Sequence, residues 1–85
     1  MRRVAASRVY INEKDFHTNH VVEIFNHHVV NHYPLQGELP MTEWLGGTII
    51  IRNRIAYHTP QILSPDDLTL KEGLGLGNGI ELTDV

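Results

Sequence analysis

Histidines are the residues of this 85-residue chain best suited to binding a metal ion or moving a proton. Imidazole is a common zinc ligand, and its unperturbed pKa lies near neutrality. The chain has six of them: His17, His20, His27, His28, His32 and His58. A helix would place His28 and His32 on one face, at a spacing that can bind zinc. A strand would hold the same two side chains about 13 Å apart, too far to share an ion.

A closed metal site needs three or four converging ligands. The sequence contains no His-x-His and no Glu-x-x-His pair to begin one. We therefore predict no metal site and no cofactor. His27, His28 and His32 are the residues that would form a site if this prediction were wrong. The simpler interpretation is that the histidines are polar side chains on the solvent face of a sheet and in its turns.

Three other patterns resemble functional motifs but have simpler explanations. Asp66 and Asp67 follow Ser-Pro, which is typical of the first turn of a helix. Glycine at every second position over 73–79 lacks the strand and helix that flank a phosphate-binding loop. The final Thr-Asp-Val resembles peptides that bind PDZ domains, but the match is short. Without cysteine or a Gly-x-Ser-x-Gly motif, we predict no catalytic residues, which argues against an enzyme without deciding the point.

The elements that would position these residues are mostly strands. β-branched runs alternate with short polar breaks, a pattern typical of hairpins. We expect strands at 3–11, 21–25, 29–33, 48–51 and 55–58. In the first of them, the face formed by Ala5, Ser7, Val9 and Ile11 is expected to point inward.

The region 20–33 has a competing interpretation. Val22, Phe25, Val29 and Tyr33 also fall at helical spacing. The β-branched content favours a hairpin, although its turn lacks an Asn-Gly or Asp-Gly pair to fix the register. Pro34 would end either element.

Residues 39–51 are expected to be the centre of the fold. They contain the only tryptophan, Trp44, and a Gly-Gly pair followed by a β-branched run. We expect one helical turn over 41–45 and a buried strand after it. The predicted core consists of Trp44, Ile49, Ile50, Ile51, Val9, Ile11, Val22 and Ile24.

The chain is short enough to form one domain, for which we predict the bounds 1–72. Ser64 and Pro65 would begin a short helix that ends near 72. The glycine-rich stretch 73–85 is expected to be a flexible tail.

Composition limits the classes of partner. The net charge of −3 gives no basic surface for nucleic acid, and no apolar run is long enough to span a membrane. The absence of cysteine is compatible with a cytoplasmic location. A core this small would gain from additional burial against another chain.

The strand rhythm of 4–11, 19–24, 29–35 and 46–51 resembles the N-terminal β segment of amidohydrolase-superfamily metal-dependent hydrolases. The resemblance implies part of a small β-sandwich that flanks a metal-bearing TIM barrel. In that family a His-x-His metal pair follows, whereas this chain continues with 52–58 and has no such pair. The resemblance thus implies the side domain's fold without the family's reaction.

These observations predict a half-sandwich or partly open barrel of about five strands, with one short C-terminal helix. We expect a non-catalytic domain that acts through self-association, as a homo-oligomer, or through a protein partner. Exposed strand edges would make the contact. The alternative is a small metal- or ligand-binding protein that uses His27, His28 and His32.

Overall fold

The computed structural model describes residues 1–12, 14–70 and 79–85, which form one sheet of seven strands and one short helix. The predicted mostly β fold is therefore confirmed. Its elements are β1 (Arg2–Tyr10), β2 (Phe16–Phe25), β3 (His28–Pro34), β4 (Glu43–Trp44), β5 (Thr48–Arg52), β6 (Ile55–Thr59), α1 (Pro65–Leu70) and β7 (Ile80–Leu82).

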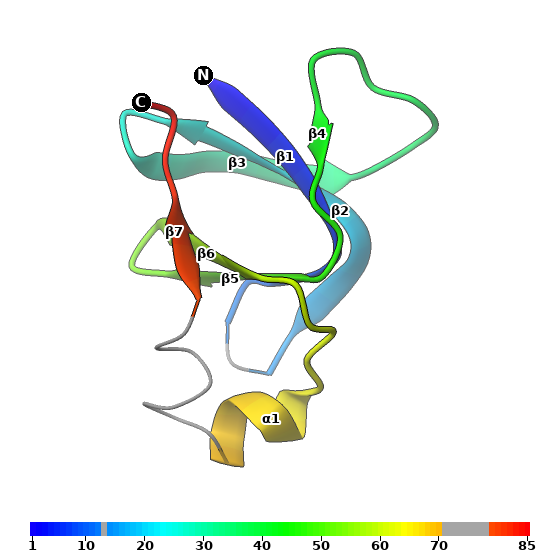
Figure 1. The fold of residues 1–85 in the computed structure, drawn as a ribbon, viewed down its shortest axis with the longest axis vertical. Helices are drawn as coiled ribbons and strands as arrows, with labels where there is room; N and C mark the ends of the chain where they lie inside the picture. Colours follow the sequence, from blue (N-terminus) through cyan, green and yellow to red (C-terminus); the bar gives the residue numbers. More distant parts are fainter. Residues whose placement is uncertain (13, 71–78) are drawn as a thin grey trace.

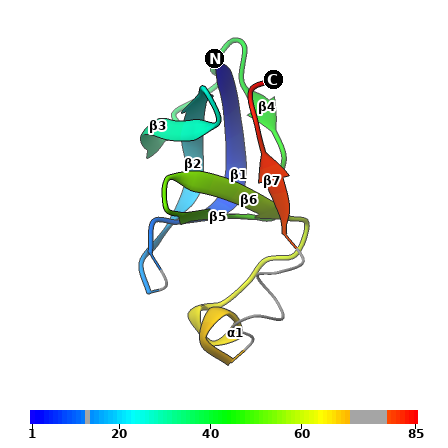
Figure 2. The same ribbon diagram turned by 90° about the vertical axis from the view of Figure 1, so that its left-hand side faces the viewer.

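The sheet has the order β3-β2-β1-β5-β6-β7 and is strongly curved (Figure 1). β1 is central: it pairs antiparallel with β2 on one side and parallel with β4 and then β5 on the other. Figure 2 shows β5 and β6 running across the direction of β1 and β2. The curvature brings β3 close to the β5–β6 turn, where the Val29 N–H donates to the Arg54 carbonyl at 2.7 Å.

Both predicted hairpins form, and the helical alternative for 20–33 is wrong. β2 and β3 are joined by Asn26 and His27, and β5 and β6 by Asn53 and Arg54. All four turn residues have φ between 51° and 70°, which is the geometry of type I′ turns. Asparagine is a usual first residue of such turns, whereas His27 and Arg54 occupy the second position, where glycine is preferred.

The first of these turns is also held from a distance. The Asp84 carboxylate accepts the N–H groups of Asn26 and His27 at 2.8 and 2.9 Å. These two hydrogen bonds lower the pKa of Asp84, with the His27 N–H making the larger contribution. Residues after β7 therefore contribute to the geometry of a turn near the middle of the chain.

The link between β4 and β5 differs from the expectation. Residues 41–45 do not form a helical turn, because Glu43 and Trp44 pair with β1 as the short strand β4. Gly46 and Gly47 then lead the chain into β5 with φ of 66° and 60°. A Cβ on Gly47 would lie 2.8 Å from the Cα of Pro60, so the backbone approach at this point requires glycine.

The main core cluster is aliphatic, and the prediction that Trp44 is at the centre of the core is wrong. Trp44 is 55% exposed, because the interior is filled by smaller side chains from β1, β2 and β5. Ile11 and Ile51 are only partly buried against it. The main cluster contains Val4, Ala6, Val9, Val22, Ile24, Ile49, Ala56 and Leu82. A second cluster under α1 contains Tyr10, Ile50 and Leu68.

The predicted inward face of β1 is only partly correct. Val9 packs in the main cluster with Val4 and Ala6, although regular alternation would put them on opposite faces. Ser7 and Asn19 are missing from the otherwise continuous β1–β2 register, and Asn19 has φ of 47°. The change of face therefore falls at this interruption.

The end of the chain is more structured than predicted. The helix starts as expected, with Ser64 and Asp67 exchanging side-chain and backbone hydrogen bonds at 2.8 and 3.3 Å. Part of the expected flexible tail, Ile80–Leu82, forms β7, because Leu82 is buried and the strand pairs with β6. Residues 71–78, which include the first six residues of the glycine-rich stretch, lie outside the described residues.

Candidate functional site

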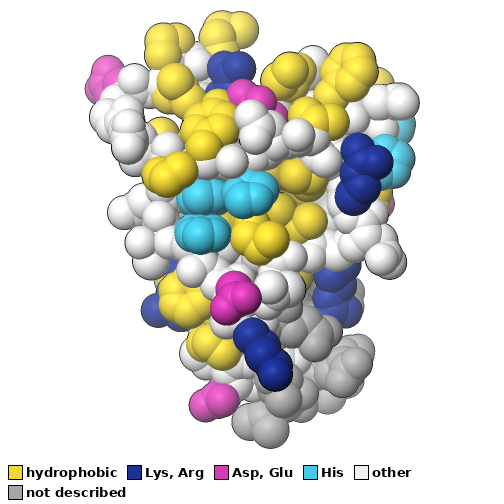
Figure 3. Space-filling view, turned by 180° about the vertical axis from the view of Figure 1, so that it is seen from behind, with side chains coloured by type: hydrophobic (Ala, Val, Ile, Leu, Met, Phe, Trp, Pro, Cys, Tyr) yellow, Lys and Arg dark blue, Asp and Glu magenta, His cyan; other side chains and the backbone are white. Residues whose placement is uncertain are grey.

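Two places on the molecule gather functional side chains. The first is a histidine cluster, which we define as His17, His20 and His32 on β2 and β3. Nε2 of His20 lies 2.9 Å from Nδ1 of His32. The His17 and His20 rings stack with their centroids 4.5 Å apart. Figure 3 shows histidine side chains side by side among apolar ones on the back of the molecule.

His20 is the buried member of this cluster, with 2% of its surface exposed, and its Nδ1 has no hydrogen-bond partner. We assign the proton to Nε2, which donates to His32, because the other tautomer would bury an unpaired N–H. Burial, followed by the neighbouring rings of His17 and His32, lowers the pKa of His20 to about 4. The His20 imidazole is therefore neutral near pH 7.

The spacing in the sequence did not reveal this cluster. His17 and His20 are three residues apart, which in a regular strand would place them on opposite faces. Asn19, with φ of 47°, breaks that alternation between them. His32 lies on the neighbouring strand, in a diagonal position to His20, which pairs with Pro34.

The structure does not bring together the three histidines that were the candidates for a metal site. The His27 ring contacts the Thr83 hydroxyl, the His28 ring bonds the Asn26 carbonyl, and His32 joins His20. Within residues 1–12, 14–70 and 79–85, no group of three or more His, Asp or Glu side chains is arranged to hold a metal ion.

The other sequence candidates have structural roles. Asp67 caps the short helix through Ser64, and Asp84 caps the β2–β3 turn. His58 bonds the Gly46 carbonyl at 3.0 Å and so helps to fix the link before β5. In the described part of the chain, no helix has the length and hydropathy needed to cross a membrane.

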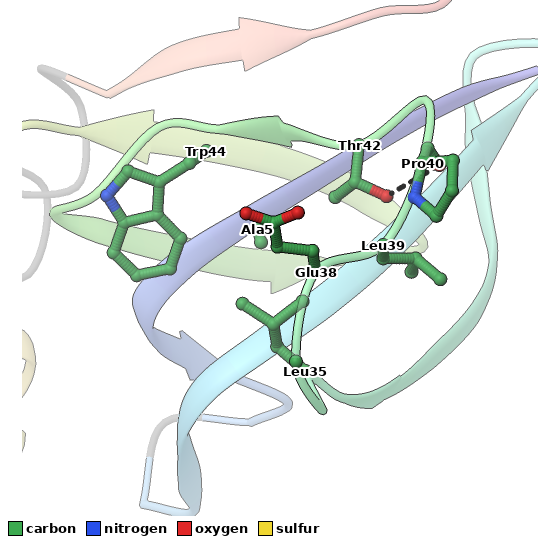
Figure 4. A pocket seen from close by; sticks show the side chains of 8 residues that line it. Ala5, Leu35, Glu38, Leu39, Pro40, Thr42 and Trp44 are labelled. Carbon is green, nitrogen blue, oxygen red and sulfur yellow. Dashed lines mark hydrogen bonds between the residues drawn. The ribbon is translucent and has the colours of Figure 1, made fainter.

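The second place is a hollow of about 530 Å³ between β1, β4 and the segment that leads into β4. We call it the Trp44 hollow. Its walls are mostly apolar, and its residues include Leu35, Leu39 and Trp44 (Figure 4). Ala5 forms part of the floor, where its small side chain leaves space beside β4. The residue mistaken for the core centre is thus a wall of an open cavity.

One carboxylate faces this apolar space. Figure 4 shows the Glu38 side chain directed into the hollow between Trp44 and Leu39. No hydrogen bond or ion pair joins Glu38 to another residue of the described ranges. Glu43 and Glu23, in contrast, are paired with Arg2 and Arg3 at 2.8 and 2.9 Å.

Met41 extends the apolar surface close to the hollow. It follows the lining residue Pro40 and is 88% exposed. Its φ of 62° is uncommon for a bulky residue. Because its side chain is exposed, Met41 gains no packing within the described chain that would offset this backbone conformation. Such outliers concentrate at functional sites, which makes this segment a candidate binding surface.

Comparisons of the chain with protein-family models, with curated proteins and with solved structures found no match. The resemblance to the amidohydrolase side domain therefore stays a prediction. The fold and the two sites define the protein as a small curved-sheet β domain with an internally bonded histidine cluster and an open apolar hollow.

Proposed function

We propose that this chain is a non-catalytic β domain that acts through protein–protein contact, either by self-association or with a separate partner. The observation that carries the proposal is the exposure of Trp44 and Met41 beside the Trp44 hollow. Tryptophan is enriched among the residues that dominate binding energy at interfaces. Exposed apolar groups around a cavity are typical of interaction sites.

The surface of the hollow is better suited to this contact than the edge of β3. Val29 already donates its N–H to Arg54, and the His32 N–H is satisfied by the Asn31 side chain at 2.9 Å. Pro34 has no N–H to offer. Such features hinder the addition of another strand. The proposal therefore places the contact at the hollow and not at the β3 edge.

A relation to the amidohydrolase side domain is part of the same proposal, as is a cytoplasmic setting. The support for the first is the strand rhythm of the sequence, and for the second the absence of cysteine. Metal or ligand binding by His27, His28 and His32 has less support, because each ring has a different partner.

Native mass spectrometry and peptide selection on the untagged protein test the two forms of this contact. Trp44→Ala removes the wall of the hollow, and Phe25→Ala is the matched control, because Phe25 is also 55% exposed. We expect a dimer, or a set of peptides selected from a random library, that is lost with Trp44→Ala and kept with Phe25→Ala. A monomer that selects no peptides, or equal losses in both variants, would contradict the proposal.

A further inference from the structure

We propose that the Trp44 hollow receives an arginine side chain of an extended partner segment, with Trp44 and Glu38 as its two recognition groups. The inference rests on the proposed function and adds the chemistry of the partner. Apolar residues on either side of the arginine would contact Leu39 and Met41. The partner is therefore a basic-apolar segment of another protein chain.

The first argument is the charge left over at this surface. Arg2 and Arg3 are the basic residues whose side chains bond the segment around the hollow, and both are already engaged. Arg2 holds Glu43 through two hydrogen bonds of 2.8 and 3.0 Å. Arg3 holds Glu23 and also reaches the Pro40 carbonyl at 3.4 Å. Glu38 is exposed and no described basic side chain pairs with it, so its carboxylate is available to a cation from another chain.

The second argument is the combination of groups in one cavity. A cation is attracted to the face of an indole ring, and the contact gains strength when water is excluded. A carboxylate beside that ring adds a charge-assisted hydrogen bond. Trp44 and Glu38 both line the same hollow, so one cationic side chain could reach both. Leu35 and Leu39 provide apolar walls for its hydrocarbon stem.

Arginine fits this site better than lysine. The planar guanidinium stacks on aromatic rings and can bond both oxygens of a carboxylate. The lysine ammonium is also attracted to an indole face, but it is more strongly hydrated and lacks the planar fork that bonds both carboxylate oxygens. The cavity of about 530 Å³ lies within the size range of ligand pockets, which leaves room for one long side chain and its neighbours.

Fluorescence of Trp44, the only tryptophan, reports binding directly. The probes are the peptide acetyl-Ala-Leu-Arg-Leu-Ala-amide and its analogue with citrulline, which has nearly the same shape without the charge. We expect the arginine peptide to bind at least about tenfold more tightly, with the lysine peptide between the two. Higher salt should reduce this preference.

Two variants test whether the Glu38 carboxylate causes the preference for the arginine peptide. Glu38→Gln should reduce the arginine preference to about twofold or less, since it removes the charge and keeps the shape. Glu81→Gln is the control, because the Glu81 side chain is also exposed and makes no hydrogen bond or ion pair within the described residues. It should keep the full preference.

The outcomes separate this inference from the function on which it rests. If the arginine and citrulline peptides bind wild-type protein equally, the arginine inference is wrong while docking in the hollow stands. If neither peptide changes the fluorescence up to millimolar concentration, the inference is also wrong, and the library selection described above decides the proposed function. An arginine preference that survives Glu38→Gln would exclude Glu38 as its cause.

Discussion

The histidine cluster and the Trp44 hollow differ in how their polar groups are satisfied. In the cluster, the side chains bond and stack on each other, and the most buried ring, His20, is only 2% exposed. In the hollow, an aromatic ring and a carboxylate share one open space, and neither makes a hydrogen bond or ion pair with a described side chain. The comparison teaches that residue chemistry alone does not identify a binding site. The side chains of the cluster satisfy each other within the fold, whereas Trp44 and Glu38 stay exposed in the hollow.

The largest effect is expected outside both regions, where the chain enters β5. Gly47→Ala should destabilise the protein by about 3 kcal/mol, because alanine would meet Thr59 and Pro60 in a left-handed conformation. Urea unfolding measures this loss. Gly37→Ala is the control, since Gly37 also has positive φ but has open space around its Cβ position. Equal losses in both variants would mean that only the backbone conformation matters.

The next effect tests the structural role of the histidine cluster. His20→Ala should cost about 2 kcal/mol, since it leaves a cavity and breaks the bond to His32. His17→Ala is the comparison within the cluster, because His17 is exposed and only stacks on His20. Equal and small losses in urea unfolding would show that the cluster does not stabilise the fold.

Stability should also depend on pH through His20. The folded pKa is about 4 and the unfolded value about 6.5, so the unfolded chain binds the proton first as the pH falls. Stability is therefore expected to be full above pH 6.5 and to fall between pH 6.5 and 4. One proton sets a maximum slope of about 1.4 kcal/mol per pH unit. His20→Leu should lack this dependence, and a wild-type curve that is flat over the same window would contradict the assignment.

A smaller effect is expected at the largest side chain of the protein. Trp44→Ala should change the free energy of unfolding by less than about 1 kcal/mol, because the ring is mostly outside the core. A buried tryptophan would cost about 3–5 kcal/mol in the same experiment. Phe25→Ala, with the same exposure, should give a similar small change. A loss near the larger value would place Trp44 back in the core.

The smallest effect is expected for Glu38→Gln, which should leave the melting temperature unchanged. Glu38 makes no hydrogen bond or ion pair with the other described residues, so its charge adds nothing to the fold. Glu43→Gln is the comparison, because it breaks the bond to Arg2. Thermal unfolding followed by circular dichroism measures both. Destabilisation by Glu38→Gln would reveal an internal partner and weaken the case for an external one.

The sequence predicted the hairpins well because they depend on local patterns. β-branched runs and short polar breaks located the strands, and Ser64 and Pro65 located the helix start. The turns themselves were harder, since Asn26 and His27 are supported by Asp84, far away in the sequence. No local pattern carries that information.

The two sites were not predicted, for different physical reasons. The histidine cluster depends on the positive φ of Asn19 and on the diagonal position of His32 on β3 relative to His20 on β2. Trp44 was assigned to the core because of its size, but the aliphatic side chains of β1, β2 and β5 already fill that space. A large apolar side chain favours burial, but the topology of the sheet determines which side chains are buried.

Quenching of Trp44 fluorescence by small ions tests the central claim most directly, and it needs no partner. If the indole lies in an open hollow beside the carboxylate of Glu38, its quenching relative to that of free tryptophan should be stronger with a caesium cation than with iodide. Glu38→Gln should remove much of that difference. An indole that neither ion quenches would be buried, and the hollow would not exist as a free binding surface.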